Sequence, residues 1–352
     1  MTTRGSVYYP YHMTGRQKSK VNWPAGSDLT AFYWRVPECG FEWIDAKPSP
    51  FQGVEKWETG EDRYLSVKAL TEARYRAYDP LQETGLFRTF ADLNPTREAI
   101  CGFADQYGLL GADPTRDCAP SVRILRSIGG NQHQQYDGET LEAWTVEQHA
   151  MRDAVSLWDA VKSRPDGNYG KAETPVKYLV SVIQWSGNAA VSYAPRSQPG
   201  FQIVSEAQPE LLMRFAPGDL TLPAQYALQR IINRKLKEYS SAAKLMWDWR
   251  RRNPDLSIQL SPTSLIAAIW LQLALAVDGD KNYRRCEACR KWFELSADVR
   301  GDAKFCKQAC RFKAYRGRQQ RARELNSEGV SVRKIAEELD TEIATVKGWL
   351  KK

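Results

Sequence analysis

Apolar residues recur at helical spacing along much of the chain. They follow a period of about 3.6 residues between 62 and 111 and again between 139 and 162, and Thr96 is placed to cap the helix that follows it. Two further helices are predicted, one at about 223–252 with an apolar stripe and one at 264–277 in which almost every residue is apolar. The body of the chain is therefore expected to be mainly helical.

A different pattern lies between 166 and 216, where β-forming residues alternate with turn residues. The predicted strands are 176–185, 190–193, 200–205 and 211–215. The polar residues 1–30 lack periodicity, and we expect them to form a flexible arm. The predicted fold class is a mainly α body with a small antiparallel β-sheet (α+β), covering residues 31–277 with a β insertion at about 170–216.

The composition is that of a globular protein. Of 352 residues, 42% are hydrophobic and 26% are charged, which excludes collagen-like, wholly disordered and integral-membrane classes. Only three residues are His, so a His-based active site is not expected. The longest apolar run, 265–277, is shorter than the roughly 20 residues of a membrane span. With no export signal at the start of the chain, we expect a cytoplasmic protein without membrane contact.

Positive charge is concentrated at the C-terminal end. The net charge is +8, and residues 281–352 hold 19 basic and 10 acidic residues, so that the rest of the chain is almost neutral. Such asymmetry favours an anionic partner, either nucleic acid or less often a membrane surface. A solvated end that binds nothing is the alternative.

Four cysteines form the most specific motif. Cys286 and Cys289 make one close pair, and Cys306 and Cys310 make a second. This spacing matches one Zn²⁺ site with four thiolate ligands at about 2.3 Å. Such a site is closed and structural, because no coordination position remains for water. Two disulfides or unrelated thiols are the alternatives, and a reducing cytoplasm argues against disulfides.

The residues around the cysteines predict a small fold at 278–325. A knuckle at 286–289 is followed by a short strand at Trp292 and Phe293, a return strand at 303–306, and a helix from Cys306 or Cys310 to Leu325. This order resembles the treble-clef zinc fingers.

The same region is similar to the zinc-finger part of the CGNR family of bacterial regulators. The matching residues are Tyr283, Arg284, Arg285, Cys286, Cys289, Trp292, Phe293, Arg300, Phe305, Cys306, Cys310, Arg311, Lys313 and Arg316. In that family the finger follows a helical domain, and the resemblance implies nucleic-acid binding. The naming motif is replaced by Arg-Phe-Lys after Cys310. Residues 78–91 look like a pattern in uncharacterised bacterial proteins, which implies no chemistry.

A run of cations without acidic residues follows the last cysteine. Its members are Arg311, Lys313, Arg316, Arg318, Arg321 and Arg323. At about 100° per residue they form two arcs of a helix. Uncompensated cations repel one another, and phosphates relieve this repulsion with release of counterions. A solvated helix face is the alternative, although it would normally carry Glu.

Residues 326–352 predict two short helices. Ile335 and Leu339 are expected to face inward on the first helix, with N-caps at Ser331 and Thr341. The inner stripe predicted for the second helix is Ile343, Val346, Trp349 and Leu350. This arrangement resembles the helix-turn-helix of resolvase-type recombinases and many bacterial regulators. An ordinary two-helix hairpin is the alternative.

The helix-turn-helix resemblance also implies how DNA is read. The second helix would enter the major groove, with these outer residues toward the bases: Glu342, Ala344, Thr345 and Lys347. Asp340 stands at the turn position where Gly is usual, and Asp tolerates a left-handed conformation at some cost.

The sequence thus predicts a DNA-binding protein, a nucleoid-associated bacterial transcriptional regulator. Residues 31–277 would bind a protein or small-molecule effector, 278–325 would hold structural Zn²⁺ and phosphates, and 326–352 would read double-stranded DNA. Proteins with a helix-turn-helix often dimerise, so a homodimer is a possible oligomeric state, although the sequence shows no heptad pattern for a coiled coil.

Two other functions are weighed. The first is a non-enzymatic protein-interaction factor, for example in a phage-defence or toxin–antitoxin setting, whose basic tail only localises it to nucleic acid. The second is an enzyme that acts on nucleic acid. The chain has no phosphate-binding Gly-Lys loop, His-Glu-x-x-His, Gly-x-Ser-x-Gly or compact carboxylate cluster, so no catalytic residue is predicted.

Overall fold

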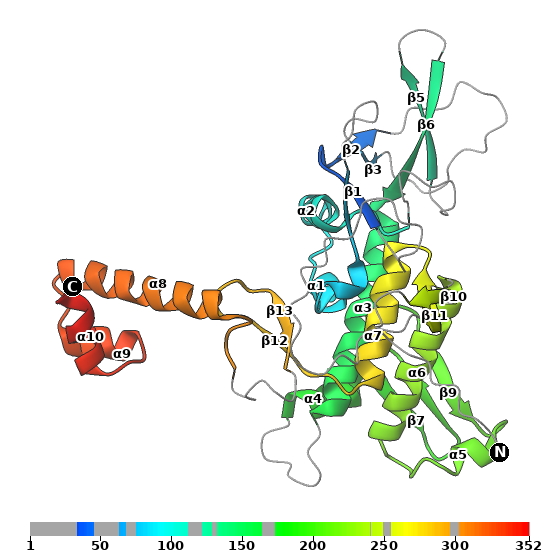
Figure 1. Cartoon of the computed structure of the whole chain (residues 1–352). Helices are drawn as coiled ribbons and strands as arrows, with labels where there is room; N and C mark the ends of the chain where they lie inside the picture. The colour runs from blue at the N-terminus through cyan, green and yellow to red at the C-terminus, as the bar shows by residue number, and fades with distance from the viewer. Residues whose placement is uncertain are drawn as a thin grey trace. The chain divides into compact units, whose positions relative to one another are not determined.

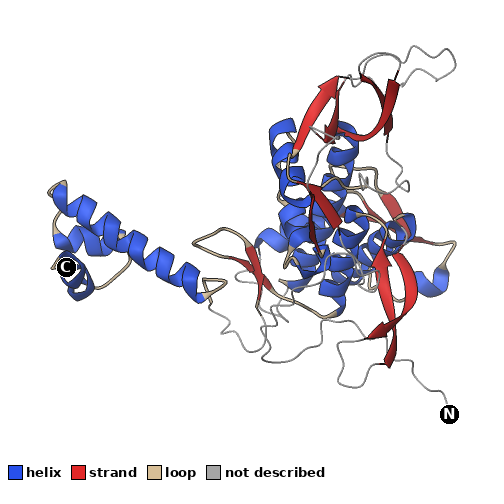
Figure 2. Ribbon diagram, turned by 45° about the horizontal axis from the view of Figure 1, so that its top comes forward, coloured by secondary structure: helices blue, strands red, loops and turns tan. Residues whose placement is uncertain are grey.

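The computed structural model describes residues 34–45, 63–67, 75–111, 122–128, 132–163, 173–239, 241–248, 255–295 and 303–351. The chain divides into two units, Met1–Val277 and Asp278–Lys352, and each is described by itself. The arm predicted at 1–30 lies outside the described residues. The structure is mostly helical with small antiparallel sheets, in agreement with the predicted fold class at this level (Figures 1 and 2).

Helix α3 (Leu141–Lys162) is central to the first unit. Three helices pack against it: α1 (Leu86–Ala91), α4 (Glu173–Val182) and α6 (Thr221–Glu238). Helix α7 (Leu265–Asp278) runs beside α3 and α6 and is buried along nearly its whole length (Figure 1). The long helix predicted at 139–162 and the apolar helix predicted at 264–277 are confirmed.

Side-chain oxygens of threonine fix the start of two helices. Thr140 Oγ accepts a hydrogen bond of 3.0 Å from the backbone N–H of Ala143 at the start of α3. Thr96 Oγ does the same for Ala99 at 3.3 Å, and α2 (Arg97–Tyr107) follows it as predicted. These bonds satisfy donors that a helix leaves unpaired at its first turn.

A buried ionic network joins helices α3, α6 and α7. The Glu147 carboxylate of α3 accepts hydrogen bonds from Lys235 Nζ at 2.6 Å and from the Tyr239 hydroxyl at 2.5 Å, both at the end of α6. Trp270 Nε1 of α7 donates to the other Glu147 oxygen at 3.3 Å. Because Glu147 and Lys235 are both buried, each needs the other as a counter-charge. The sequence pattern did not indicate this network.

The described strands of the first unit form four antiparallel sheets. Two of them have two strands each: β1 (Trp34–Pro37) pairs with β4 (Tyr75–Tyr78), and β10 (Ser241–Asp248) pairs with β11 (Asp255–Pro262). A sheet of four strands has the spatial order β2 (Phe41–Asp45), β3 (Arg63–Val67), β6 (Gln132–Thr140) and β5 (Val122–Ile128). A sheet of three strands has the order β7 (Ile183–Ser186), β8 (Ala190–Tyr193) and β9 (Phe201–Ser205). The turn between β7 and β8 contains Gly187 at φ +56°, which suits a residue without Cβ. Two short helical segments complete the unit, the 3₁₀ turn Pro80–Gln82 and α5 (Pro209–Leu212).

Helix α6 is shorter than predicted. The helix expected at 223–252 ends at Glu238, and β10 begins three residues later. The register of β10 with β11 sets Ala243, Leu245 and Trp247 opposite Leu260, Ile258 and Leu256. Pairing with an apolar strand that follows in the sequence therefore overrides the continuation of the helical stripe.

Other expectations for the first unit are also wrong in part. Residues 173–182 form α4 rather than a strand, because Leu179 and Val182 are buried at helical spacing and the helix packs on α3. The strand predicted at 211–215 is replaced by α5, where Pro209 occupies the first helical turn. The stretch 62–111 contains α1 and α2 as expected, but β3 and β4 precede them.

The described residues of the second unit form a hairpin and three helices. Strands β12 (Tyr283–Arg285) and β13 (Trp292–Glu294) pair in antiparallel fashion. They are followed by α8 (Gln308–Ser327), α9 (Val332–Glu338) and α10 (Ile343–Leu350), the last two of which pack on α8. None of the described helices in either unit has the length and hydropathy that a membrane span needs.

Candidate metal centre and nucleic-acid interface

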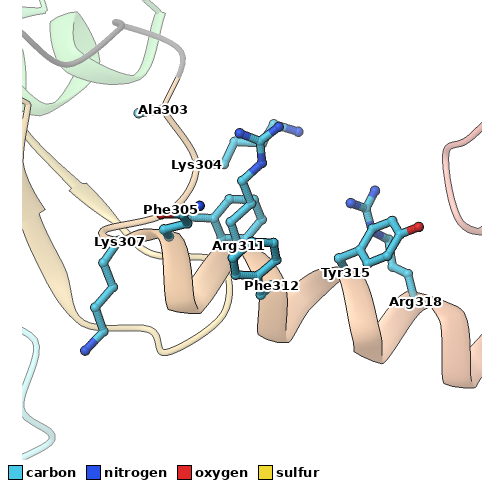
Figure 3. Close-up of a pocket in the computed structure, with 9 residues that line it drawn as sticks. Ala303, Lys304, Phe305, Lys307, Arg311, Phe312, Tyr315 and Arg318 are labelled. Carbon is cyan, nitrogen blue, oxygen red and sulfur yellow. The ribbon is translucent and has the colours of Figure 1, made fainter.

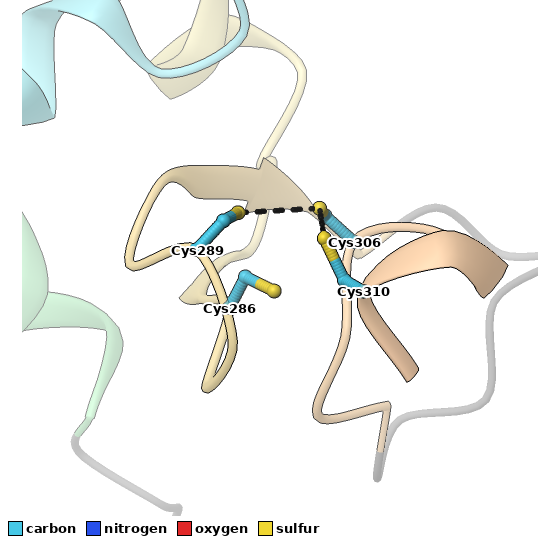
Figure 4. A group of neighbouring side chains, drawn as sticks. All are labelled: Cys286, Cys289, Cys306 and Cys310. Carbon is cyan, nitrogen blue, oxygen red and sulfur yellow. Dashed lines mark hydrogen bonds between the residues drawn. The ribbon is translucent and has the colours of Figure 1, made fainter. Parts of the chain in front are cut away.

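The four predicted cysteines come together in one cluster, here called the four-cysteine cluster. The sulfur atoms of Cys286, Cys289, Cys306 and Cys310 all lie within 4.8 Å of one another (Figure 4). The Sγ–Sγ distance is 3.7 Å between Cys289 and Cys306 and 3.5 Å between Cys306 and Cys310. Tetrahedral ligation with Zn–S bonds of about 2.3 Å separates the ligand sulfurs by about 3.8 Å. The cluster therefore has the dimensions of a metal site.

The disulfide alternative does not fit this geometry. All four cysteines are free, and the quoted separations far exceed the sulfur–sulfur bond length of about 2.05 Å. These four convergent thiols could hold one metal ion in a closed, structural site.

The hairpin turn places the first two cysteines. Cys286 directly follows the last residue of β12. Its N–H donates a hydrogen bond of 2.9 Å to Lys291 O, and its carbonyl oxygen accepts one of 2.8 Å from Arg290 N. Arg290 has φ +60°, a left-handed conformation that reverses the chain. This tight loop directs the sulfurs of Cys286 and Cys289 to the same side (Figure 4).

The second pair lies where α8 begins. Cys306 precedes the helix and Cys310 is in its first turn. The return strand predicted at 303–306 is absent, because this segment is bound by scattered contacts instead of a ladder. Glu287 N–H donates to Lys304 O at 3.0 Å, and Arg284 Nη1 donates to Ala303 O at 3.0 Å. The short strand predicted at Trp292 and Phe293 is confirmed as β13.

The electrostatics differ among the thiols. Burial raises the pKa of Cys286, but the backbone N–H groups of Cys306, Cys289 and Ala288 donate to its sulfur and bring the pKa down to about 6. Burial and the neighbouring thiols raise the pKa of Cys306 to about 12, and burial raises that of Cys310. Four sulfurs this close cannot all ionise without a cation between them.

The six predicted phosphate contacts are all exposed on α8. Within the described residues, only Arg321 of the six has an acidic partner within 4.0 Å. It pairs with Glu338 of α9 at 3.4 Å and with Glu324 at 3.7 Å. The prediction that the run is free of counter-charges is therefore wrong at Arg321, because the fold brings Glu338 to it from another helix. The other five cations are Arg311, Lys313, Arg316, Arg318 and Arg323.

The last turns of α8 pack with α9 and α10 in what we call the three-helix cluster. Its buried residues are Ala322, Leu325, Ile335, Ala336, Val346 and Trp349. Leu339 and Leu350 pack partly buried against it, as expected from the inner stripes, but Ile343 is 45% exposed and does not face inward. Helix α8 thus belongs to both the four-cysteine cluster and the three-helix cluster.

The turn between α9 and α10 contains Asp340 at φ +46°, so Asp does adopt the left-handed conformation there. Ser331 is the N-cap residue of α9, although its side chain makes no capping bond. The N-cap of α10 is Glu342 rather than Thr341, because the turn extends one residue further.

The predicted base-reading residues lie at the start and outer side of α10. Glu342, Ala344 and Lys347 are exposed, and Thr345 is half-buried. At about 100° per residue, Ala344 and Lys347 lie on the side of α10 away from the buried Trp349.

A groove of about 990 Å³ along the start of α8 was not predicted. Phe312 and Tyr315 line it together with Lys304, Arg311 and Arg318 (Figure 3). The signal in the sequence was the pair of aromatic residues inside the cationic run, which would ordinarily be assigned to packing.

Comparisons with known proteins add no relative to this picture. No protein-family model matches the chain, and neither curated proteins nor solved structures show a significant match. The CGNR, treble-clef and helix-turn-helix resemblances stay predictions.

Proposed function

We propose that this chain is a DNA-binding protein, a bacterial transcriptional regulator whose C-terminal unit is folded around one structural Zn²⁺ ion. The observation that carries the proposal is helix α8. It begins in the four-cysteine cluster, ends in the three-helix cluster, and between them exposes five cations without an acidic partner among the described residues. Phosphates are the ligands that such a row of cations favours.

Zinc suits the donors of the four-cysteine cluster, because thiolates at these separations are typical of structural zinc. The ion would neutralise thiolate charge and link the hairpin to the first turn of α8. The hydrophobic residues around the cluster are few, with Phe293 buried and Leu295 and Phe305 partly buried against it. Metal binding would therefore supply folding free energy that this small core lacks.

Helices α9 and α10 would act as the helix-turn-helix. The outer side of α10, with Ala344 and Lys347 exposed, would face base edges in the major groove of double-stranded DNA. The first unit would bind the protein or small-molecule effector, and the protein would reside on the nucleoid in the cytoplasm. Base contacts would specify the site while α8 supplies affinity.

The test is duplex binding by the full-length protein, measured by fluorescence anisotropy over a range of KCl concentrations. Genomic fragments that the purified protein retains supply the duplexes. Affinity should fall steeply with salt. Arg318→Ala should weaken binding to every duplex and make the slope of log K against log salt shallower by about 0.9, whereas Lys347→Ala should change the order of preference among duplexes.

Lys237→Ala is the matched control, because Lys237 is an exposed cation on α6 in the other unit. It should leave affinity and salt slope unchanged.

Arg321→Ala should have a smaller effect on the slope than Arg318→Ala, since Arg321 is already paired with Glu338. Failure to retain any duplex at low salt would refute the proposal, and equal affinity for all duplexes would remove base reading from it.

A further inference from the structure

The groove on α8 is lined by aromatic and cationic side chains. It is formed by the segment just before α8 and by the first three turns of the helix. The residues that matter are Lys304, Phe305, Arg311, Phe312, Tyr315 and Arg318. Figure 3 shows Phe312 and Tyr315 following each other along the helix, with the cationic side chains beside them.

Two large rings are open to solvent here. Phe312 is 53% exposed and Tyr315 is 41% exposed. A helix that only contacts duplex phosphates needs cations and gains nothing from exposed rings, because the bases of a duplex are stacked inside it. Exposed aromatic side chains among cations are instead characteristic of surfaces that bind unpaired nucleotides, on which each base can stack.

The rings lie between the two arcs of cations. At about 100° per residue, Tyr315 and Phe312 follow the arc of Arg311 and Arg318 by about 40° and 100°, and the arc of Arg316 and Lys313 comes next. A base stacked on Phe312 would therefore have cations on either side of it for its flanking phosphates.

Both ends of the groove are fixed before any ligand binds. Phe305 packs against the four-cysteine cluster. The Tyr315 hydroxyl accepts a hydrogen bond of 2.9 Å from Trp349 Nε1 of α10. A site held in place in this way loses little conformational entropy on binding.

We propose that this groove binds an unpaired nucleotide of DNA, with its base stacked on Phe312 and its phosphates near Arg311 and Arg318. The inference rests on the proposed DNA binding and narrows its substrate: the preferred target is DNA with unpaired bases next to a duplex, such as a short bubble. An acidic peptide would also satisfy the cations, but it offers no planar base to the exposed ring, so unpaired DNA fits the groove better.

The experiment compares the binding of three DNA probes that share one labelled strand to the full-length protein: a paired duplex, a duplex whose second strand is mismatched at four bases to form a bubble, and the labelled single strand. We expect the bubble probe to bind about tenfold more tightly than the paired duplex. Phe312→Leu keeps an apolar side chain but loses the aromatic face, so it should abolish this preference and leave paired-duplex affinity unchanged. Phe312→Trp should retain it.

The outcomes separate the two proposals. Equal binding of bubble and paired duplex by the wild type, or an equal loss for both with Phe312→Leu, overturns the nucleotide site and leaves duplex binding standing. Binding of the single strand and bubble without the paired duplex supports the nucleotide site and refutes duplex reading. Binding of none of the probes refutes both. Circular dichroism of Phe312→Leu, whose side chain is exposed, confirms that the variant is folded.

Discussion

The indole Nε1 of Trp349 donates a hydrogen bond of 2.9 Å to the hydroxyl of Tyr315, and the two rings meet edge-on with centroids 5.6 Å apart. Trp349 is buried in the three-helix cluster, whereas Tyr315 lines the groove. The pair thus connects the packing of α10 to the side of α8 that lines the groove.

This pair predicts two different losses of stability. Tyr315→Phe removes only the acceptor and should cost about 1 kcal/mol. Trp349→Ala removes a buried ring and should cost about 3–5 kcal/mol. Hydrogen exchange at the amides of α9 and α10, followed by mass spectrometry, measures both. Unchanged exchange in Trp349→Ala would contradict the assigned packing.

The four-cysteine cluster predicts one divalent ion per chain. Cys306→Ser should lose the ion, because three thiolates and a hydroxyl bind Zn²⁺ far more weakly than four thiolates do. Cys39→Ser, outside the cluster in the first unit, is the matched control and should keep it. Elemental analysis after purification under reducing conditions gives the stoichiometry. Metal-free protein in which residues 278–352 remain protected from exchange would disprove a structural ion.

The left-handed turn before α10 predicts a gain in stability. Asp340 has φ +46°, where an L residue is strained and Gly is not. Asp340→Gly should therefore stabilise the three-helix cluster by up to about 1 kcal/mol. Gly329→Ala should destabilise it by a similar amount, because Gly329 has φ +82°, where an L residue is strained. The added Cβ would meet nothing within 4 Å, so the cost would come from the backbone alone and not from a clash. Urea unfolding compares the two, and effects of the same sign would count against the strain.

The ionic network of the first unit predicts a large effect of a small change. Glu147→Gln leaves Lys235 buried without its main counter-charge, and of its acidic partners in the described part of the chain only the half-exposed Glu238 at 3.1 Å remains. The cost should be about 3 kcal/mol. Glu142→Gln, on an exposed position of the same helix, should change stability by no more than about 0.5 kcal/mol. Calorimetry of the full chain distinguishes them, and equal shifts would rule out a special role for the buried pair.

Local signals in the sequence were sufficient for the four-cysteine cluster and for the long apolar stripes. The spacing of Cys286 and Cys289 is set within a single turn, and the stripe of α3 is set by its own period, so both could be predicted. The end of α6 could not, because it depends on the pairing of β10 with a strand that comes later in the chain.

Contacts between residues that are far apart in the chain could not be predicted from the sequence either. Glu338 is 17 residues beyond Arg321, and the sequence alone gave no reason to pair them. Tyr315 and Trp349 are 34 residues apart, and their contact fixes Tyr315 at the position where it lines the groove. Patterns of period identify which side of a helix is apolar, but they do not say what covers it.

Helix α8 has 20 residues and is about 30 Å long, and about 18 Å of it separates Cys310 of the four-cysteine cluster from Ala322 of the three-helix cluster. A continuous helix fixes rotation as well as distance. One alanine inserted after Gly317 would turn α9 and α10 by about 100° around the α8 axis relative to the cysteines, whereas seven would return them to within about 20°. The rotational phase between the exposed cations of α8 and the outer side of α10 is therefore encoded in the residue count of one helix.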